Sequence, residues 1–326
     1  MRQLVNLVLL LPLLIGSTLA SELPDHQAAV QGDASAQYNL GFIYFNAVGA
    51  DQDYEEAAHW YTLAAKQDHT KAQYVLGMLY TAGWGVERSH EKAAHWYTLA
   101  ALQGHAKAQY ELGRMHLHGK FVEKNVDIAI GWFQKSGLQG NLDAQQTLGV
   151  IYNSHPDISR DLHKSLKWHL LAAEQGDTDS QVAVGMMLIS EGIPHNYDSA
   201  FSWFQRAAVR ENRVAQSFLA DCYFLGQGVE ADPAEAIIWL RRSAENGYPS
   251  AQYMLGYFYS TEGVLKRNDL YAYMWFSLAE EAGYEEAISE KALLIAMMSQ
   301  KDLGIAKTLF QSCAENDLKD CETLQI

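Results

Sequence analysis

The chain has 326 residues, of which 48% are hydrophobic, so it can bury a core. Its 39 acidic and 24 basic residues give a net charge of -15, and a surface of that sign repels nucleic acid and anionic lipid headgroups. We therefore expect no nucleic-acid partner, and with 6 prolines against 24 glycines we expect little disorder.

The first twenty residues read as a secretory signal peptide. Arg2 supplies a positive start, residues 4–15 are almost unbroken apolar sequence, and Thr18-Leu19-Ala20 offers small residues for cleavage. The apolar run is shorter than the ~20 residues of a bilayer span, which disfavours the alternative of a signal anchor. Residues 1–20 are therefore predicted to be removed, leaving a periplasmic or otherwise secreted chain with no integral membrane segment.

Two markers recur through the rest of the chain. Tryptophan repeats every 36 residues, with one interval of 35, at Trp60, Trp96, Trp132, Trp168, Trp203, Trp239 and Trp275. Glutamine precedes it by 23 residues, or 22 in the fifth unit, at Gln37, Gln73, Gln109, Gln145, Gln181, Gln216 and Gln252. A period of this size is typical of stacked helical units, so residues 33–284 are predicted to form seven repeats of about 36 residues. Trp132 is expected to fill space between stacked hairpins, so that its removal would open a cavity.

Apolar spacings of three and four residues divide each repeat into two helices, here called helix A and helix B. Helix A carries a small residue where neighbouring helices must approach closely, at Gly41, Gly77, Gly113, Gly149, Gly185, Ala220 and Gly256. Helix B follows a good N-cap, at Asp53, Ser89, Asn125, Asp161, Asn196, Asp232 and Asn268. Glu56 is expected to close a capping box onto Asp53, and Pro233 to occupy the first helical position.

Helix B is expected to stop at a residue in the left-handed conformation. The stop residues are Gly104, Gly140, Gly176, Gly247 and Gly283, with Asp68 and Glu211 as departures. Beyond the repeats, residues 21–32 are predicted to cap the N-terminal end, and residues 285–326 to form a closing helix pair and tail. Ser299 is the expected N-cap of the last helix, and the outer faces of this pair are expected to be polar.

These motifs carry a resemblance. The string Ala-x-Ala-Gln-Tyr-x-Leu-Gly, a Gly-x-Gly-Val turn and Ala-x-x-Trp-Tyr-x-x-Ala-Ala resemble the Sel-one-like repeat family of the tetratricopeptide-like superfamily. The fourth and fifth units depart from it in the turn, with His155-Pro156 and Gly192-Ile193-Pro194. The resemblance implies an all-α, right-handed superhelical solenoid of helix-turn-helix repeats. It also implies an adaptor or interaction scaffold, often exported, that binds a protein or peptide.

Three cysteines follow the signal segment, so they cannot all pair within one chain. Cys313 and Cys321 are close enough in sequence for a disulfide clip, whereas Cys222 falls inside a helix and is expected to be buried. Three free thiols are the alternative.

Two patterns in the sequence match catalytic motifs only in part. The glycines of Gly83-x-Gly85 and Gly226-x-Gly228 fit turns better than a phosphate loop. Ser89-x-x-Lys92 matches an acyl-enzyme motif, but its partner motifs are missing and Ser89 is already an N-cap.

Histidines suggested no metal site either. His116-x-His118, His59 and His95 are the best metal candidates, but His116 stands where most repeats have tyrosine, which favours packing. We therefore expect no enzyme, cofactor or metal, and keep as an alternative an extracytoplasmic enzyme or binding protein for cell-wall or β-lactam-like substrates.

A candidate groove lies on the helix A face. Positions one, five, eight and nine after the marker glutamine should face the concave side of a tetratricopeptide-like hairpin. The fifth positions are Phe42, Met78, Arg114, Val150, Met186, Asp221 and Tyr257. From this face we predict a partner-binding groove of Phe42, Met78, Arg114, Leu117, His118, Met186, Ile189 and Tyr257. The alternative is that these side chains pack between neighbouring A helices.

Overall fold

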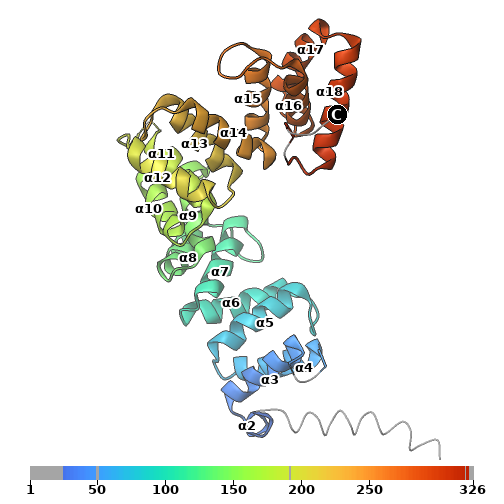
Figure 1. The fold of residues 1–326 in the computed structure, drawn as a ribbon. Helices are drawn as coiled ribbons and strands as arrows, with labels where there is room; N and C mark the ends of the chain where they lie inside the picture. Colours follow the sequence, from blue (N-terminus) through green and yellow to red (C-terminus); the bar gives the residue numbers. More distant parts are fainter. Residues whose placement is uncertain (1–24, 49–50, 191, 320, 323–326) are drawn as a thin grey trace, which may run out of the picture. The chain divides into compact units, whose positions relative to one another are not determined.

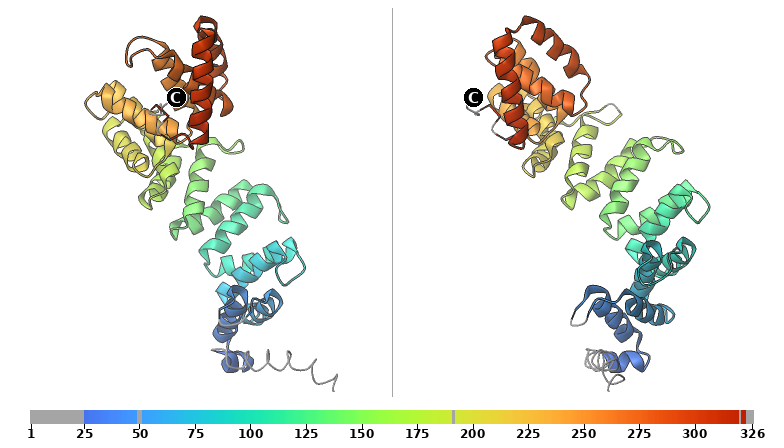
Figure 2. Two further views of the ribbon diagram at one scale, coloured as in Figure 1. Left: turned by 45° about the vertical axis from the view of Figure 1, so that its right-hand side comes forward. Right: turned by 90° about the vertical axis from the view of Figure 1, so that its right-hand side faces the viewer.

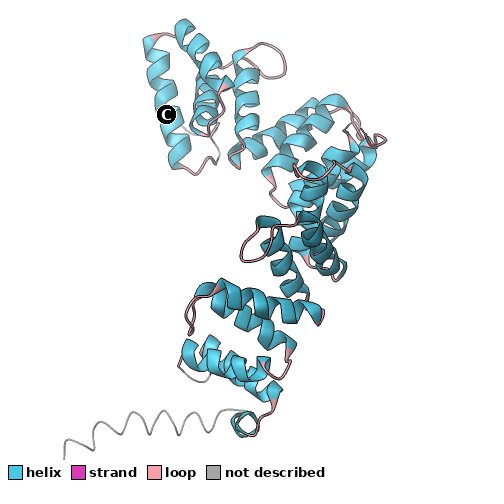
Figure 3. Cartoon of the chain, turned by 180° about the vertical axis from the view of Figure 1, so that it is seen from behind, coloured by secondary structure: helices cyan, strands magenta, loops and turns pink. Residues whose placement is uncertain are grey.

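The computed structural model describes residues 25–48, 51–190, 192–319 and 321–322, and every regular element within those ranges is a helix (Figure 3). The all-α fold class and the helix-turn-helix repeat are confirmed. The expected signal peptide lies outside the described residues. Two compact units, residues 1–148 and 149–326, are described one at a time.

Unit 1 is built of consecutive helical hairpins (Figure 1). Its helices are α2 (His26–Val30), α3 (Ala34–Asn46), α4 (Tyr54–Ala65), α5 (Thr70–Ala82), α6 (His90–Leu102), α7 (Ala106–His118), α8 (Val126–Leu138) and the first half of α9 (Leu142–Ser154). Each helix A packs against its own helix B, as α3 does on α4 and α5 on α6. Helix B in turn packs against the next helix A, as α4 does on α5 and α6 on α7, and α2 covers α3.

Unit 2 continues the same arrangement (Figure 2). After the end of α9 come α10 (Leu162–Glu174), α11 (Thr178–Leu188), α12 (Tyr197–Ala208), α13 (Arg213–Leu225), α14 (Pro233–Glu245), α15 (Pro249–Ser260), α16 (Asp269–Glu281), α17 (Glu286–Met297) and α18 (Gln300–Glu315). The closing pair, α17 and α18, packs on α16.

The expected N-caps of helix B are confirmed in every repeat. Asp53 shows the pattern: its Oδ1 accepts from the N–H groups of Glu55 and Glu56 at 2.9 and 3.0 Å. Its own N–H donates to the carbonyl oxygen of Tyr44 in the preceding helix A, at 3.0 Å. The expected capping box with Glu56 is therefore wrong, because the N–H that it would satisfy is already bonded across the hairpin.

Helix B also ends as expected. The residue after its last turn has a positive φ in every repeat, including the two departures, Asp68 at 60° and Glu211 at 63°. Pro233 occupies the first position of α14. The turn between a helix B and the following helix A is consequently the same throughout, which fixes how one hairpin meets the next.

Close packing within a hairpin depends on a small residue in helix A and a ring in helix B. A Cβ added to Gly77 would lie 2.7 Å from the ring of Tyr97, and one added to Gly113 would lie 2.7 Å from the ring of Phe133. Tyr97 is 3% exposed and Phe133 fully buried. The residue that fills the hairpin is therefore the one after the marker tryptophan.

The marker tryptophan itself is less buried than expected. Trp132 is only half-buried, and Lys135 lies over its ring at 4.3 Å. Trp168 and Trp275 are buried, at 4% and 0% exposed, so the position varies along the chain. Trp132 thus packs against the core of α6 and α7 without being enclosed by it, and Phe133 is the fully buried residue of its own hairpin.

The marker glutamines are buried and join consecutive hairpins. Gln73 Nε2 donates to the carbonyl oxygen of Ala65 at 3.2 Å, which ties helix A to the end of the preceding helix B. Its Oε1 accepts from Gln103 Nε2 at 2.7 Å, at the end of its own helix B. Gln109 repeats both bonds, with Ala101 and Gln139. We call this series the glutamine ladder; it satisfies both ends of a buried amide, which would otherwise be costly.

The glutamine ladder is interrupted at two places in unit 2. Gln181 and Gln252 keep the bond to the preceding helix B, at 3.1 Å each, but the Oε1 atom of each is buried without a partner among the described residues. The position that supplies the donor elsewhere holds Arg210 and Ala282. Arg210 donates to the carbonyl oxygen of Gly176 instead, and alanine has no donor to give.

The closing pair follows its expected outline, with Ser299 Oγ accepting from the N–H of Asp302 at 3.1 Å. The outer face of the closing pair differs from the expectation. On α17 the side chains of Ile288, Leu293 and Met297 are 50%, 63% and 65% exposed. The expectation of a polar outer face is therefore wrong for this helix, since a single terminal hairpin leaves part of an apolar helix without a neighbour to cover it.

Candidate functional site

The helix A row of unit 1 holds both apolar and charged side chains. Phe42 on α3 is 48% exposed, while Met78 on α5 is half-buried against the neighbouring core. Arg114 on α7 is exposed, forms an ion pair with Glu111 at 3.1 Å and lies over the ring of Tyr110 at 5.9 Å. A partner carboxylate at Arg114 would therefore compete with Glu111.

The ninth position in unit 1 is open to solvent and the eighth is partly covered. His118 is exposed at the end of α7, whereas Leu117 is half-buried one residue earlier. The eighth-position residue of α3, Phe45, is also partly covered: its ring contacts those of Tyr54 and Trp84, with centroids 5.4 and 5.7 Å away. Eighth-position side chains thus take part in packing.

Unit 2 presents a row of exposed side chains at the fifth position. Val150, Met186 and Tyr257 are 55%, 44% and 43% exposed, on α9, α11 and α15. Ile189 is half-buried, follows the last turn of α11 and packs against the hydrophobic core. The two alternatives for the helix A face therefore apply to different positions: fifth-position side chains are exposed except for Met78, and eighth-position side chains pack.

Asp221 is the fifth-position residue of α13 and the acidic member of this row. Although part of its side chain reaches solvent, desolvation by the surrounding helices raises the pKa of Asp221 to about 6. Beside it in sequence, Cys222 is a buried free thiol, and burial followed by the nearby Asp221 raises the pKa of Cys222 to about 11. A thiol of that kind is inert, so Cys222 is a packing residue as expected.

Two histidines use one ring nitrogen to cap a helix A. His69 Nδ1 accepts from the N–H of Ala72 at 3.2 Å, and its ring stacks on Tyr38 with centroids 4.8 Å apart. His105 does the same one repeat later, accepting from Ala108 at 3.2 Å. Burial lowers the pKa of both rings, which holds them neutral and able to accept. Sequence reasoning missed this role because histidine is not a usual N-cap.

A hollow of about 550 Å³ opens beside the first of these histidines. It is lined by Ser35, Tyr38, Asn39, Asp68, His69, Thr70 and Lys71. Tyr38 and His69 are stacked on each other, and Asn39 Nδ2 donates to Asp25 at 2.6 Å. Asn39, His69 and Thr70 are thus already bonded to residues outside the lining.

The remaining candidate metal ligands and the candidate nucleophile take part in packing or in helix capping. His116 is half-buried with Nδ1 3.1 Å from the carbonyl oxygen of Glu123, and His59 packs edge-on against Trp60. In the part of the chain that the structure describes, no three His, Cys, Asp or Glu side chains gather as a metal site would require. Ser89 Oγ accepts from the N–H of Lys92 at 3.3 Å as the cap of α6.

The glycine turns are tight for steric reasons. Gly85 has a φ of 66°, and an added Cβ would overlap the backbone of Tyr54 at the start of the preceding helix B. Gly228 lies in the same way against the backbone of Tyr197. These glycines let a loop rest on the neighbouring repeat, so no phosphate site is needed to account for them.

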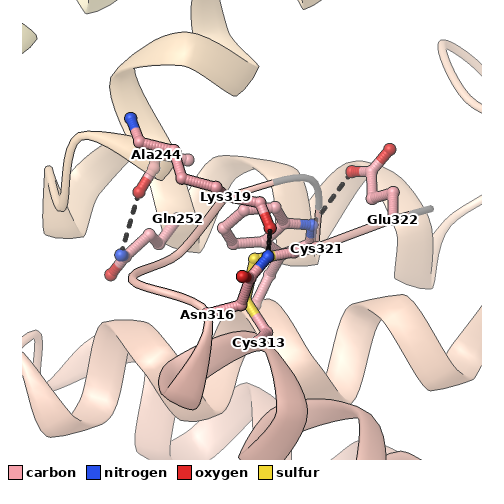
Figure 4. The surroundings of a disulfide bond; sticks show 8 residues. Ala244, Gln252, Cys313, Asn316, Lys319, Cys321 and Glu322 are labelled. Carbon is pink, nitrogen blue, oxygen red and sulfur yellow. Dashed lines mark hydrogen bonds between the residues drawn. A yellow bond between two sulfur atoms is a disulfide. The ribbon is translucent and has the colours of Figure 1, made fainter. Parts of the chain in front are cut away.

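The C-terminal end carries a disulfide between Cys313, in α18, and Cys321 (Figure 4). Both cysteines are fully buried. Between them, Asn316 Nδ2 donates to the carbonyl oxygen of Lys319 at 2.7 Å, and Lys319 Nζ donates to Asn246 Oδ1 at 3.3 Å. The disulfide and these bonds hold the tail against the end of α14.

The hairpins, the glutamine ladder and the helix A rows together define a helical repeat protein. A model of the Sel1 repeat matches residues 34–69, 70–105, 106–141, 142–177, 178–208, 213–248 and 249–284. The chain therefore belongs to the Sel1 repeat family, whose members generally act as protein-interaction scaffolds and are generally not catalytic. A search of the curated proteins returned no significant match.

Two solved structures are similar to the chain. One is a protective antigen present in uropathogenic Escherichia coli strains and displaying an SLR fold, with 27% identity over 93% of this chain and a TM-score of 0.75. The chain spans 66% of that protein's length. The other is a Sel1 repeat protein from Oxalobacter formigenes, with 30% identity over 68% of this chain, 88% of that protein covered and a TM-score of 0.54.

Proposed function

We propose that the chain is a non-enzymatic scaffold that holds a protein or peptide partner against the fifth-position side chains of its A helices. The observation that carries this proposal is the row in unit 2, where Val150, Met186 and Tyr257 expose 43–55% of their surface at one register. Neighbouring repeats do not bury these side chains, and apolar and aromatic groups are the usual anchors of protein interfaces. Asp221 adds an exposed carboxylate at the same register, which can accept from a hydrogen-bond donor of the partner.

Position-specific photocrosslinking in intact cells of the native host tests this proposal. A crosslinking residue at Tyr257 should give a discrete adduct, and Met186→Ala in the same chain should lower its yield. The matched control is a crosslinking residue at Ile238, which is 42% exposed and lies on α14, a helix B. It should give no such adduct. Met186→Ala should change stability by less than about 0.5 kcal/mol, as exposed sites do. Equal adducts from both positions would contradict the proposal.

We also propose that the scaffold works outside the cytoplasm, as a periplasmic or secreted protein. Support comes from Arg2, the apolar residues 4–15 and the small residues before Ser21. The intact mass of the protein from its native host should correspond to a chain that begins at Ser21. A full-length chain in the cytoplasmic fraction would refute the location without affecting the binding row.

Acylation by a labelled β-lactam separates the scaffold from the enzymatic alternative. We expect no covalent adduct, because the Ser89 hydroxyl is engaged as the cap of α6. An adduct that disappears in Ser89→Ala would establish the alternative instead.

A further inference from the structure

Glu322, near the end of the chain, is bound by donors from three helices. Its carboxylate pairs with Arg241 of α14 at 2.6 Å and accepts from Tyr259 Oη of α15 at 2.6 Å and Trp275 Nε1 of α16 at 3.0 Å. Figure 4 shows Glu322 beside the disulfide. The hydroxyl of Tyr271 donates to the backbone carbonyl oxygen of Glu322 at 2.6 Å. The Glu322 side chain is only 12% exposed. This is a complete carboxylate pocket, with a cation and two neutral donors.

The cation of this pocket, Arg241, is not part of the repeat pattern. Two residues after the marker tryptophan, the other repeats carry Thr62, Thr98, Gln134, Leu170, Gln205 and Ser277. Arg241 is the charged exception, and its Nε is buried without a partner among the described residues. The Arg241 side chain is 33% exposed, so its charge is only partly desolvated, and a carboxylate beside it offsets that cost whichever chain supplies it.

The tail supplies that carboxylate through a covalent tether. Cys321 is bonded to Cys313 and directly precedes Glu322, so the disulfide holds the carboxylate at the pocket. A tethered group of this kind competes at the high effective concentration of an intramolecular ligand. Without the disulfide, the tail would keep only its non-covalent contacts.

We propose that Arg241, Tyr259 and Trp275 form a binding site for an acidic side chain of a partner protein, which Glu322 fills in cis once the disulfide has formed. Before that oxidation the pocket is open to a carboxylate in trans. In closing it, the two thiols lose two protons and two electrons to a disulfide oxidant, which leaves as a dithiol. This site is separate from the helix A row and does not depend on it.

Peptide binding to full-length variants tests the proposal. The probe is a fluorescent synthetic peptide of residues 314–326 carrying Cys321→Ser, and the control peptide carries Glu322→Gln in addition. The oxidised wild-type protein should bind neither. A Cys321→Ser/Glu322→Gln protein should bind the probe at least tenfold more tightly than the control peptide, measured by fluorescence anisotropy. Adding Arg241→Gln should abolish this preference.

The result that overturns the proposal is an open-pocket variant that binds both peptides equally or neither. Glu322 would then be a structural anchor only. If the double variant unfolds locally, Glu322→Ala with the disulfide intact replaces it. Propionate should raise its melting temperature, and should not do so when Arg241→Gln is added; a propionate effect that ignores Arg241 refutes the site.

Discussion

Replacing Gly77 with alanine tests how the hairpins are packed. Alanine is normally the better helix residue, by about 1 kcal/mol. Here its Cβ would lie 2.7 Å from Cδ1 and Cε1 of Tyr97, well inside the ~3.5 Å at which carbon atoms pack comfortably. The ring is 3% exposed and has no free space to move into, so overpacking should cost roughly 1–3 kcal/mol. We expect a net destabilisation of about 1 kcal/mol.

The chain offers a matched control and a matched rescue. Gly131 lies in α8 with nothing within 4 Å of an added Cβ, so Gly131→Ala should stabilise by roughly 0.5–1 kcal/mol. In the sixth repeat the small residue is Ala220 and the ring is replaced by Leu240. Adding Tyr97→Leu to Gly77→Ala should therefore recover about 1 kcal/mol relative to the sum of the single changes.

Urea unfolding followed by circular dichroism measures all four variants. Transition midpoints are compared directly, because repeat arrays can unfold in more than one step. If Gly77→Ala proves as stabilising as Gly131→Ala, or if the double variant shows no favourable coupling, the interlock between glycine and ring does not hold the hairpin together.

Three further outcomes follow from the packing and the hydrogen bonds. Phe133→Ala should cost about 3–5 kcal/mol and Trp132→Ala clearly less, because only the phenylalanine is fully buried; urea midpoints decide. Ala282→Gln should supply the donor that Gln252 Oε1 lacks and stabilise by about 1 kcal/mol, seen as a higher melting temperature; no gain would mean that the buried oxygen is satisfied otherwise. Burial lowers the pKa of His69, so below about pH 6.5 the unfolded state takes up a proton that the native ring resists, and stability falls as the pH falls. His69→Asn keeps a capping oxygen and should flatten that fall between pH 7 and 5, whereas an unchanged pH profile would contradict the capping role.

Features set by local chemistry could be predicted from the sequence. The N-caps, the left-handed residues that end helix B and the small residues of helix A each depend on a few neighbours along the chain. The ring that meets Gly113 could not be assigned, because Trp132 and Phe133 are adjacent and the repeat period does not tell which of two adjacent aromatic residues points inward. The structure shows that Phe133 is the inward ring, because a Cβ on Gly113 would lie 2.7 Å from it.

Long-range polar contacts lay beyond the sequence pattern. The bond from Gln103 to Gln73 starts at a residue that looks like an ordinary exposed helix end. The Glu322 pocket depends on Arg241, which breaks the repeat rather than following it. One signal was available: Arg241 is the charged residue in a position otherwise held by uncharged ones. The fifth-position row was chosen by analogy with related hairpins, and its binding role stays a prediction.

The glutamine ladder determines where repeats of this kind can change length. Each glutamine bonds to a carbonyl eight residues earlier, across the turn that leads into its helix A, as Gln109 does to Ala101. The turn has the same length wherever this bond forms, so an inserted residue there would separate the glutamine amide from the carbonyl oxygen that it bonds. The loop between helix A and helix B is closed by a backbone bond from the N-cap of helix B to helix A, and the span of that bond varies: Asn196 donates to Leu188, eight residues earlier, whereas Asp161 donates to Tyr152, nine residues earlier. Insertions, grafted loops or tags should therefore be tolerated between helix A and helix B, away from the close contacts of Gly85 and Gly228, and rejected at the opposite end of each hairpin.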